Sequence, residues 1–389
     1  MWNVADFVAA MSEASDRSGV RRARAAAVLL AIAACDGGGG GGGGGDGSGL
    51  VREAGVGSDA GAGAPRDGAS DGGAEAGPEQ PEEIELRAVS FNICGGQCNG
   101  GDAGALDAAY PLIDAFAPQL VFLQEVCWSQ YEAFNAHYAG TYEASFATIL
   151  KNYRGCGVAD CSVNEDDDPT NDEPRCWLGP MVAGRGTRTN AEALPIGGNA
   201  NQVNGANPVV PPRDFHAACA AFALTDLPSR VVRACSAHFR AFQDPNGVND
   251  AARLEQATKL TGHLAGAVSA GAIVVIGGDL NAPPTKASMN PFYALDAPGQ
   301  TGAGAYHEAD QDDRRYYAAY CPADAGACRS GAATLGPRGA GASAGTVKYD
   351  YVFFSETSDA TSVSGLPIDV ATSDHAFLRA AIEVATAPR

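Results

Sequence analysis

Eight polar side chains that stand beside short apolar runs are of types that take part in chemistry. They are carboxylates, carboxamides and histidines: Asn92, Glu125, His238, Asp279, Asn281, Asp350, Asp374 and His375. Carboxylate and amide oxygens are hard ligands of the kind that hold Mg²⁺ or Mn²⁺ in proteins. A pair of histidines beside a carboxylate can move protons or bind a phosphate oxygen. The residue types therefore favour metal-assisted chemistry on a phosphate, provided that the fold brings them together.

The apolar patterning shows which elements could position these side chains. Short apolar runs predict strands, including a hairpin formed by 219–224 and 230–237; the other strands are 86–93, 120–123, 273–276, 349–354 and 376–384. Apolar spacing predicts one helix over 106–116. A second helix is predicted with Asn249 as its N-cap, and its inward residues are Leu254, Ala257, Leu260 and Leu264. Since polar groups after buried strands gather at one edge of a sheet, we expect a single α/β domain with its chemistry at that edge.

Six short motifs occur in an order that resembles the endonuclease/exonuclease/phosphatase (DNase I-like) superfamily. They are Ser90-Phe91-Asn92-Ile93, Leu123-Gln124-Glu125-Val126, Ser236-Ala237-His238, Gly278-Asp279-Leu280-Asn281, Tyr349-Asp350-Tyr351 and Ser373-Asp374-His375. Taken singly, each also fits a turn, a helix cap or a solvated strand end; the ordered set over about residues 86–384 is what carries the resemblance. It implies a four-layer α/β/β/α sandwich of two packed mixed β-sheets.

The resemblance also implies an activity and a cofactor. Members of the superfamily, which include AP endonucleases, bacterial sphingomyelinases and inositol-polyphosphate 5-phosphatases, hydrolyse phosphate esters by in-line attack of water. Glu125 would be the principal ligand of Mg²⁺ or Mn²⁺. Asn92 and Asp374 would assist it, directly or through water. A divalent cation would also explain how an acidic protein can act on a polyanion.

The remaining motif residues would handle water and phosphate. By resemblance, Asp279, held by Asn281, positions or deprotonates the attacking water. Asp350 orients His375 and raises its affinity for a proton, so that His375 can donate to a phosphate oxygen. His238 supplies a second donor on the other side of the phosphate.

The sequence departs from the family pattern in places that decide the substrate. Cys94 stands where many members have an acidic or polar residue, and Ala237 replaces the usual threonine before the middle histidine. The aromatic or arginine side chain that members present from their middle loops has only two candidates here, Tyr153 and Arg213.

The first 83 residues have the pattern of a targeting segment and a linker. Basic residues precede a ten-residue apolar run, 25–34, which is typical of a secretory signal and too short to span a bilayer. Ile32-Ala33-Ala34-Cys35 resembles a bacterial lipobox, which implies acylation of Cys35; an ordinary signal peptide is the alternative. Residues 36–83, rich in Gly and Asp, predict a disordered tether. We therefore expect an exported lipoprotein, anchored at the cell surface or outer membrane, or a secreted protein, with its folded domain at 84–389 and an insertion near 151–213.

The cysteine count fits export. The sequence has 11 cysteines, and setting aside Cys35 leaves an even number, as in secreted proteins that pair their cysteines. Plausible pairs by proximity are Cys94–Cys98, Cys156–Cys161, Cys219–Cys235 and Cys321–Cys328, which leaves Cys127 for Cys176. The sequence alone does not fix this connectivity.

The composition excludes some classes of protein but does not identify the substrate. With 45% hydrophobic residues and a net charge of −20, the chain is neither membrane-polytopic nor a generic basic nucleic-acid binder. We expect a nuclease acting on extracellular nucleic acid, with Arg213, Arg240, Arg314 and Arg315 as candidates for a locally basic rim. One alternative is a sphingomyelinase-like phospholipid phosphodiesterase, whose bilayer-facing tips would be Phe292-Tyr293 and Tyr316-Tyr317. Another is a catalytically silent surface binding module of the same fold.

Overall fold

The fold is described here from a computed structural model of the full 389-residue chain. It describes residues 82–151, 153–157, 174–197, 202–204, 207–210, 215–241, 247–294, 304–310, 329, 331–336, 347–355 and 363–387. The predicted signal segment with Cys35, nearly all of the predicted linker, Arg213, Arg314, Arg315, Tyr316 and Tyr317 lie outside these ranges. No helix within them is both long and apolar enough to cross a lipid bilayer.

Two sheets of six strands each form the centre of the described structure. The first sheet has the order β13 (Val363–Asp369), β14 (Ala376–Ala385), β1 (Glu83–Asn92), β2 (Leu120–Cys127), β4 (Leu178–Gly184) and β3 (Glu143–Phe146). The second has the order β11 (His307–Glu308), β12 (Asp350–Phe354), β10 (Ile273–Asp279), β9 (Val231–His238), β8 (His216–Leu224) and β5 (Gly186–Pro195). Both sheets are mixed, since β1 and β2, and likewise β9 and β10, run parallel. A separate hairpin pairs β6 (Gln202–Asn204) with β7 (Asn207–Val210).

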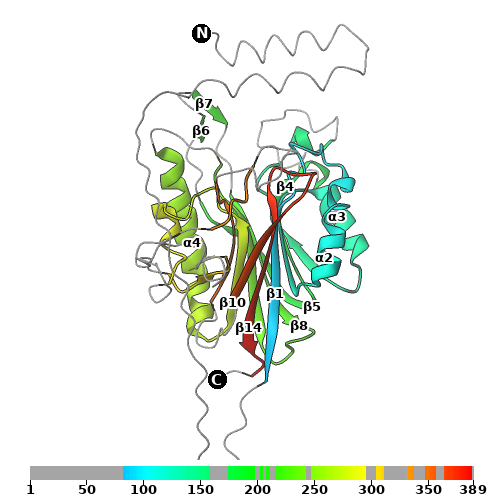
Figure 1. The fold of residues 1–389 in the computed structure, drawn as a ribbon. Coiled ribbons are helices and arrows are strands. Elements are labelled where there is room, and N and C mark those ends of the chain that lie inside the picture. Colours follow the sequence, from blue (N-terminus) through cyan, green and yellow to red (C-terminus); the bar gives the residue numbers. More distant parts are fainter. Residues whose placement is uncertain are drawn as a thin grey trace, which may run out of the picture. The chain divides into compact units, whose positions relative to one another are not determined.

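Helices cover the outer faces of the two sheets (Figure 1). Helices α2 (Tyr110–Phe116) and α3 (Trp128–His137) pack on the first sheet, and α4 (Val248–Ser269) packs on the second. Short 3-10 turns complete the set: η1 (Ala103–Leu106), η2 (Arg154–Cys156), η4 (Pro174–Cys176) and η5 (Ala287–Met289). The expected four-layer α/β/β/α sandwich is confirmed.

Three apolar clusters hold these layers together. One lies between the sheets and joins residues such as Phe122 and Leu378 of the first sheet to Phe222 and Val352 of the second. The other two fill the space under α4 and under α2 and α3. Because both faces of the central strands are covered, some of them contain continuous apolar runs that are readable in the sequence, such as 120–123 of β2 and 273–276 of β10.

Several expected element boundaries differ from the structure. The helix expected over 106–116 is divided into η1 and α2. Gly247, in the left-handed conformation, caps α4 in place of Asn249, and Leu254 is 40% exposed where an inward position was expected. Asn249 lies inside the first turn and is buried. Leu254 sits on the outer side of α4, so its hydrophobicity does not report burial.

Two strands of the central sheets lie within 151–213, the range expected to hold an insertion. Within it, β4 is buried along its whole length and pairs with both β2 and β3, and β5 forms the edge of the second sheet. The Gly and Pro residues of β4 favoured a loop interpretation. Gly179 is required there because a Cβ atom would lie 1.8 Å from the Ala147 carbonyl oxygen. The glycine thus serves close approach of two strands.

Two of the expected disulfides are present and two are corrected. Cys94–Cys98 and Cys219–Cys235 form as expected. Cys127 pairs with Cys156, which rules out both Cys127–Cys176 and Cys156–Cys161. Cys176 is itself disulfide-bonded, and Cys321 and Cys328 lie outside the described residues. The correct partner of Cys127 is set by the fold of the chain around η2, which sequence proximity does not predict.

Packing between the sheets gives a first prediction. A Cβ atom on Gly277 would lie 2.4 Å from the ring of Phe122 on the opposite sheet, so Gly277→Ala forces the two sheets apart. We expect it to lower the free energy of unfolding by about 1–3 kcal/mol. Gly262→Ala is the matched control, since open space surrounds Gly262 on α4 and the change should stabilise by about 0.5–1 kcal/mol. Urea unfolding of both variants measures the change in the free energy of unfolding. Equal changes in the two variants would contradict the close packing at Gly277.

Candidate active site

Strand register brings the predicted residues to one edge of the molecule. In the second sheet, Asp279 at the end of β10 lies opposite His238 at the end of β9 and opposite Asp350 at the start of β12. In the first sheet, Asn92 at the end of β1 lies opposite Gln124 of β2. The two sheets meet at this edge, because Asn92 hydrogen-bonds across to Asp279.

Asn92 is the link between the two carboxylates of the site. Its Nδ2 donates to Asp279 Oδ2 at 3.0 Å and to Glu125 Oε1 at 3.2 Å. Its Oδ1 accepts the Cys94 backbone N–H at 2.9 Å. In this orientation the amide of Asn92 holds Glu125 and Asp279 in place. The expected role of Asn92 as a metal ligand stays a prediction.

Asp279 is the buried centre of the constellation. Its Oδ2 lies 3.6 Å from His238 Nε2 and 3.7 Å from His375 Nε2, with the Asn92 amide as a further neighbour. Burial raises the pKa of the Asp279 carboxyl, and the positive charge of His375 opposes that rise. A carboxylate surrounded by proton donors in this way can orient or deprotonate a water molecule.

Asp350 and His375 form a buried pair. His375 Nδ1 lies 2.8 Å from Asp350 Oδ2, and the expected orientation of His375 by Asp350 is present. Burial alone would lower the pKa of His375, but the carboxylates of Asp350 and Asp279 raise it to about 10. His375 therefore carries a proton at neutral pH, with Nε2 turned toward Asp279.

Glu125 stands in an irregular part of β2. The register of β2 with β4 shifts between Leu123 and Val126, and Glu125 has a φ of 54°. A bulge of this kind redirects a side chain out of the strand alternation. The Glu125 side chain keeps 20% of its surface exposed, and its Oε1 lies 3.9 Å from His238 Nε2. Glu125 is thus the carboxylate of this group that solvent and ligands reach most easily.

Asn281 fixes one carboxylate oxygen of Asp279. Asn281, with a φ of 50°, donates its backbone N–H to Asp279 Oδ1 at 2.9 Å, and its side-chain Nδ2 donates to the Phe239 carbonyl. It thereby holds Asp279 as expected, although through its backbone.

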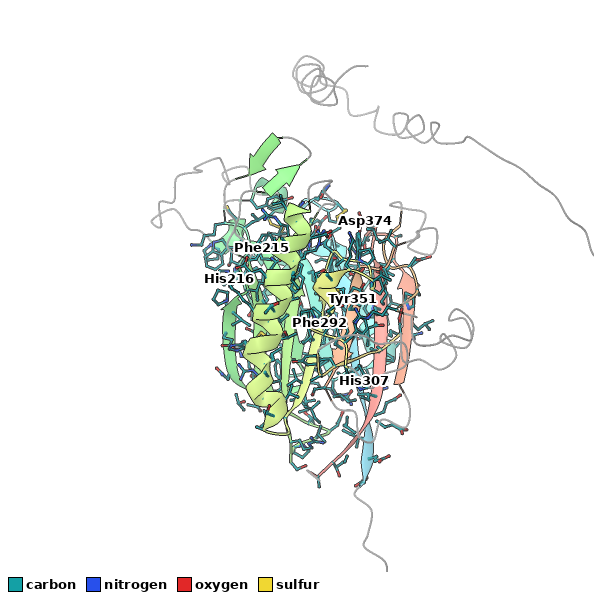
Figure 2. All side chains as sticks on the ribbon, turned by 90° about the vertical axis from the view of Figure 1, so that its left-hand side faces the viewer. Phe215, His216, Phe292, His307, Tyr351 and Asp374 are labelled. Carbon is teal, nitrogen blue, oxygen red and sulfur yellow. A yellow bond between two sulfur atoms is a disulfide. The ribbon has the colours of Figure 1, made fainter. Side chains whose placement is uncertain are left out.

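An Asp374 oxygen lies within 4.8 Å of the sulfurs of the Cys94–Cys98 disulfide. Figure 2 shows Asp374 near the upper end of the sheets.

Supporting residues were not recognised in the sequence as part of the site. Gln124 Nε2 donates to Ser236 Oγ at 3.1 Å, a buried hydrogen bond between the two sheets. Ser373 donates to the Asn92 carbonyl at 2.7 Å and accepts the His375 N–H at 3.0 Å. These three residues stand inside the quoted motifs, so the motifs themselves were the available signal.

A buried ionic cluster also lies behind Asp350. Lys348 Nζ contacts Asp310 at 3.0 Å and Glu308 at 3.2 Å, and it donates to the Asp350 carbonyl at 3.1 Å. Burial alone would lower the pKa of Lys348, but Asp310 and Glu308 raise it above its usual value. No apolar or turn pattern in the sequence singles out Glu308 or Asp310.

Three residues that were predicted to lie at the surface, Arg240, Phe292 and Tyr293, are buried. Arg240 is 1% exposed, so it does not form part of a basic rim. Phe292 and Tyr293 are fully buried, and Phe292 packs on Phe353 with ring centroids 5.0 Å apart. They are therefore not a bilayer-facing tip. Tyr153 is half-buried and packs in the cluster around Cys127 and Leu178.

The donor set fits a hard divalent cation. Glu125, Asp279 and Asp350 lie in one group, and the side chains that form ion pairs with them within the described ranges are His238 and His375. One oxygen of Asp350 is buried without a hydrogen-bond partner. Carboxylates that are close together and not neutralised by Lys or Arg favour a cation such as Mg²⁺. Glu125, whose side chain keeps 20% of its surface exposed, is the member of this group that a cation reaches most easily. An oxygen of Asp374 lies beside the Cys94–Cys98 sulfurs, and its expected role as a metal ligand stays a prediction.

Comparison with known proteins places the chain among proteins of one family. Residues 89–375 match the model of the Endonuclease/Exonuclease/phosphatase family. Among solved structures, a protein of this family from Bacteroides thetaiotaomicron superposes with a TM-score of 0.50 at 11% identity, over 78% of this chain and 96% of that one. The human Nocturnin catalytic domain, with bound sulfate, gives a TM-score of 0.49 at 15% identity, over 78% of this chain and 97% of that one. Truncated Caenorhabditis elegans TDP2 gives a TM-score of 0.49 at 12% identity, over 77% of this chain and 98% of that one. No curated protein matched the chain.

Proposed function

Because the chain belongs to the endonuclease/exonuclease/phosphatase family, we propose that it is a divalent-metal-dependent phosphodiesterase that acts as a nuclease outside the cell. The observation that carries the proposal is the placement of Asp279 between His238 and His375, with Asn92 bridging Asp279 to Glu125. Side chains from both sheets thus converge on one point. A binding module would not need this buried arrangement of acid, base and ligand groups.

The proposed reaction uses three kinds of group from this chain. Asp279, with its second oxygen held by the Asn281 N–H, orients water for in-line attack on phosphorus and accepts its proton. His375, kept protonated by Asp350, donates a hydrogen bond or proton to a phosphate oxygen. His238 binds the phosphate from the opposite side of Asp279.

Glu125 and Asp374 would hold Mg²⁺ or Mn²⁺ near the phosphate. When bound, the cation supplies positive charge that stabilises the phosphate and the leaving oxygen. Asn92 keeps Glu125 in place through its amide. This role of Glu125 agrees with its exposure, which is the greatest among the three carboxylates grouped around His238 and His375.

We propose a nucleic acid rather than a lipid as the substrate, since one of the two apolar tips expected of a lipid phosphodiesterase is buried. Reaching a bilayer requires an exposed apolar tip, and Phe292 and Tyr293 are buried. Three large apolar residues are notably exposed in the described ranges, namely Val231, Leu254 and Leu366. They lie on β9, α4 and β13. Val231 is the first residue of β9, at the far end of that strand from His238. The secretory segment and the lipobox-like Cys35 support export and a lipid anchor for this nuclease.

A substrate panel tests the proposal. The full chain, with Mg²⁺ and then with EDTA, is assayed on plasmid DNA, single-stranded RNA, sphingomyelin vesicles and bis-p-nitrophenyl phosphate. We expect hydrolysis of a nucleic acid and of bis-p-nitrophenyl phosphate, lost in EDTA. If sphingomyelin were the only substrate hydrolysed, the proposed function would change from nuclease to phospholipid phosphodiesterase. A folded protein without turnover on any ester would favour a binding module. Palmitate labelling of wild type, lost in Cys35→Ala, tests the anchor.

A further inference from the structure

Lys348 is a buried lysine that the proposed reaction does not use. Its side chain is 2% exposed. Burial lowers the pKa of Lys348, but Asp310 and Glu308 raise it above its usual value, so the side chain carries a positive charge. An ammonium group has three N–H donors, and three acceptors lie within reach: Asp310 Oδ2 at 3.0 Å, Glu308 Oε1 at 3.2 Å and the Asp350 carbonyl at 3.1 Å. Lys348 therefore ties the backbone of Asp350 to two carboxylates of another segment.

The backbone of Asp350 is held by side chains where its neighbouring strand has ended. Strand β11 pairs with β12 at Phe353 and Phe354, short of Asp350. At Asp350 itself, the carbonyl accepts from Lys348 Nζ, and the N–H donates to Thr334 Oγ1 at 2.9 Å. Because a buried backbone group without a partner is costly, these two side chains complete the edge of β12.

The carboxylate of Asp350 is held through one oxygen. Its Oδ2 lies 2.8 Å from His375 Nδ1, whereas its Oδ1 is buried without a hydrogen-bond partner among the residues that the structure describes. The direction of the carboxylate therefore follows from the position of the Asp350 backbone. A shift of that backbone would lengthen the contact with His375, and a misplacement of about 1 Å in an active site can lower a rate about a hundredfold.

The stem of Lys348 is packed closely enough to act as a rigid link. A Cβ atom on Gly331 would lie 2.1 Å from Lys348 Cδ and 2.6 Å from its Cε. Lys348 Nζ lies 4.7 Å from the centre of the Tyr351 ring. A lysine stem is flexible by itself, so these contacts are what fix the position of the ammonium group.

We propose that Lys348 is a positioning residue of the active site: its ammonium group fixes the Asp350 backbone to Asp310 and Glu308 and thereby keeps the Asp350 carboxylate on His375. The inference rests on the proposed phosphodiesterase function and adds to it a residue that acts through another. The competing role is a purely structural one, in which the buried charges stabilise the fold and leave the reaction unaffected.

Two kinds of variant disturb this link in different ways. The neutral triple variant combines Lys348→Met with Glu308→Gln and Asp310→Asn, so that neither carboxylate stays buried and charged without its lysine. Gly331→Ala keeps every charge and displaces the Lys348 stem. Near-ultraviolet circular dichroism and urea unfolding show whether each variant is folded. If the triple variant does not fold, Gly331→Ala carries the test.

Kinetics on bis-p-nitrophenyl phosphate with Mg²⁺ measure the effect on the reaction. We expect the triple variant to lower kcat about 10–100-fold, and Gly331→Ala to lower it about 3–10-fold, with KM within about twofold of wild type in both. Added to Asp350→Asn, the triple change should cause no further loss, because Lys348 acts through that carboxylate. The control is Lys259→Met with Glu255→Gln, which removes an exposed lysine–glutamate pair on α4 and should keep kcat within about twofold.

Proton NMR provides a second readout that does not require activity. The Nδ1 proton of His375, which is held by the Asp350 carboxylate, should give a downfield resonance in wild type that is missing in His375→Gln. The triple variant and Gly331→Ala should move this resonance upfield or lose it through exchange with water. The Lys259 control should keep it at the wild-type position.

The two readouts separate the inference from the proposed function. If wild type hydrolyses no ester, the proposed function fails, and the His375 resonance alone decides the role of Lys348. A resonance that is absent in wild type, or unchanged in the folded variants, overturns the inference. In an active enzyme it is also overturned if the folded variants keep the wild-type kcat, or if the triple change lowers kcat further on the Asp350→Asn background.

Discussion

Glu125→Gln is expected to lower kcat/KM for a phosphodiester by about a thousandfold, or roughly 4 kcal/mol of transition-state stabilisation. The amide keeps the shape of the side chain and removes the negative charge that would hold the cation. The Asn92 amide that donates to Glu125 Oε1 loses a charged acceptor as well. Initial rates on bis-p-nitrophenyl phosphate across a range of Mg²⁺ concentrations measure the effect, and half-saturation should move to higher Mg²⁺.

Glu132→Gln is the control for this change, because Glu132 is exposed on α3. It should leave both the rate and the Mg²⁺ dependence within twofold of wild type. If Glu125→Gln kept a rate within threefold of wild type at every Mg²⁺ concentration, Glu125 would not be the cation ligand and the site would need a different carboxylate.

The Asp350–His375 pair should behave as one functional unit. Asp350→Asn and His375→Gln are each expected to lower kcat by about 10²–10⁴, since either change removes the oriented proton donor. The double variant should be no slower than the slower single variant, because residues that act together are not additive. His263→Gln, on the exposed side of α4, is the matched histidine control. Additive losses in the double variant would show that the two side chains act separately.

The same pair gives a pH dependence with a definite sign. The carboxylates of Asp350 and Asp279 raise the pKa of His375 to about 10, so the wild-type imidazole stays protonated through neutral and mildly alkaline pH. Asp350→Asn removes the larger of these two influences and lowers that pKa. The residual activity of Asp350→Asn should therefore fall at a lower pH than wild-type activity does. Coincident alkaline limbs in the two kcat profiles would contradict this assignment.

Much of the site was predictable because its residues follow buried strands. His238 and Asp279 each end an apolar run, and two parallel strands with their ends in register must place such residues side by side. Asp350 joins them because β12 pairs with β10 from its first residue. The two packed sheets were implied by the resemblance of the ordered motifs to the family, whereas the apolar runs alone predicted only an α/β domain.

The parts that sequence reasoning missed depend on tertiary contacts. The orientation of the Asn92 amide follows from the Cys94 N–H and two carboxylates that arrive from other strands. The bulge that turns Glu125 outward has no sequence signature, because glutamate has no intrinsic preference for a positive φ. The buried partners of Lys348 come from a segment far away in the chain. Each of these features is created by a neighbour that periodicity does not reveal.

The most direct measurement of the central claim is the Mg²⁺ dependence of phosphodiester hydrolysis by the full chain. The protein is stripped with EDTA, dialysed, and assayed on bis-p-nitrophenyl phosphate while Mg²⁺ is added back. The account predicts no hydrolysis above background in the stripped protein and a rate that rises with Mg²⁺ to saturation. A stripped protein that hydrolyses the ester at its full rate, or a folded one that stays inactive on this ester at every Mg²⁺ and Mn²⁺ concentration, would contradict it.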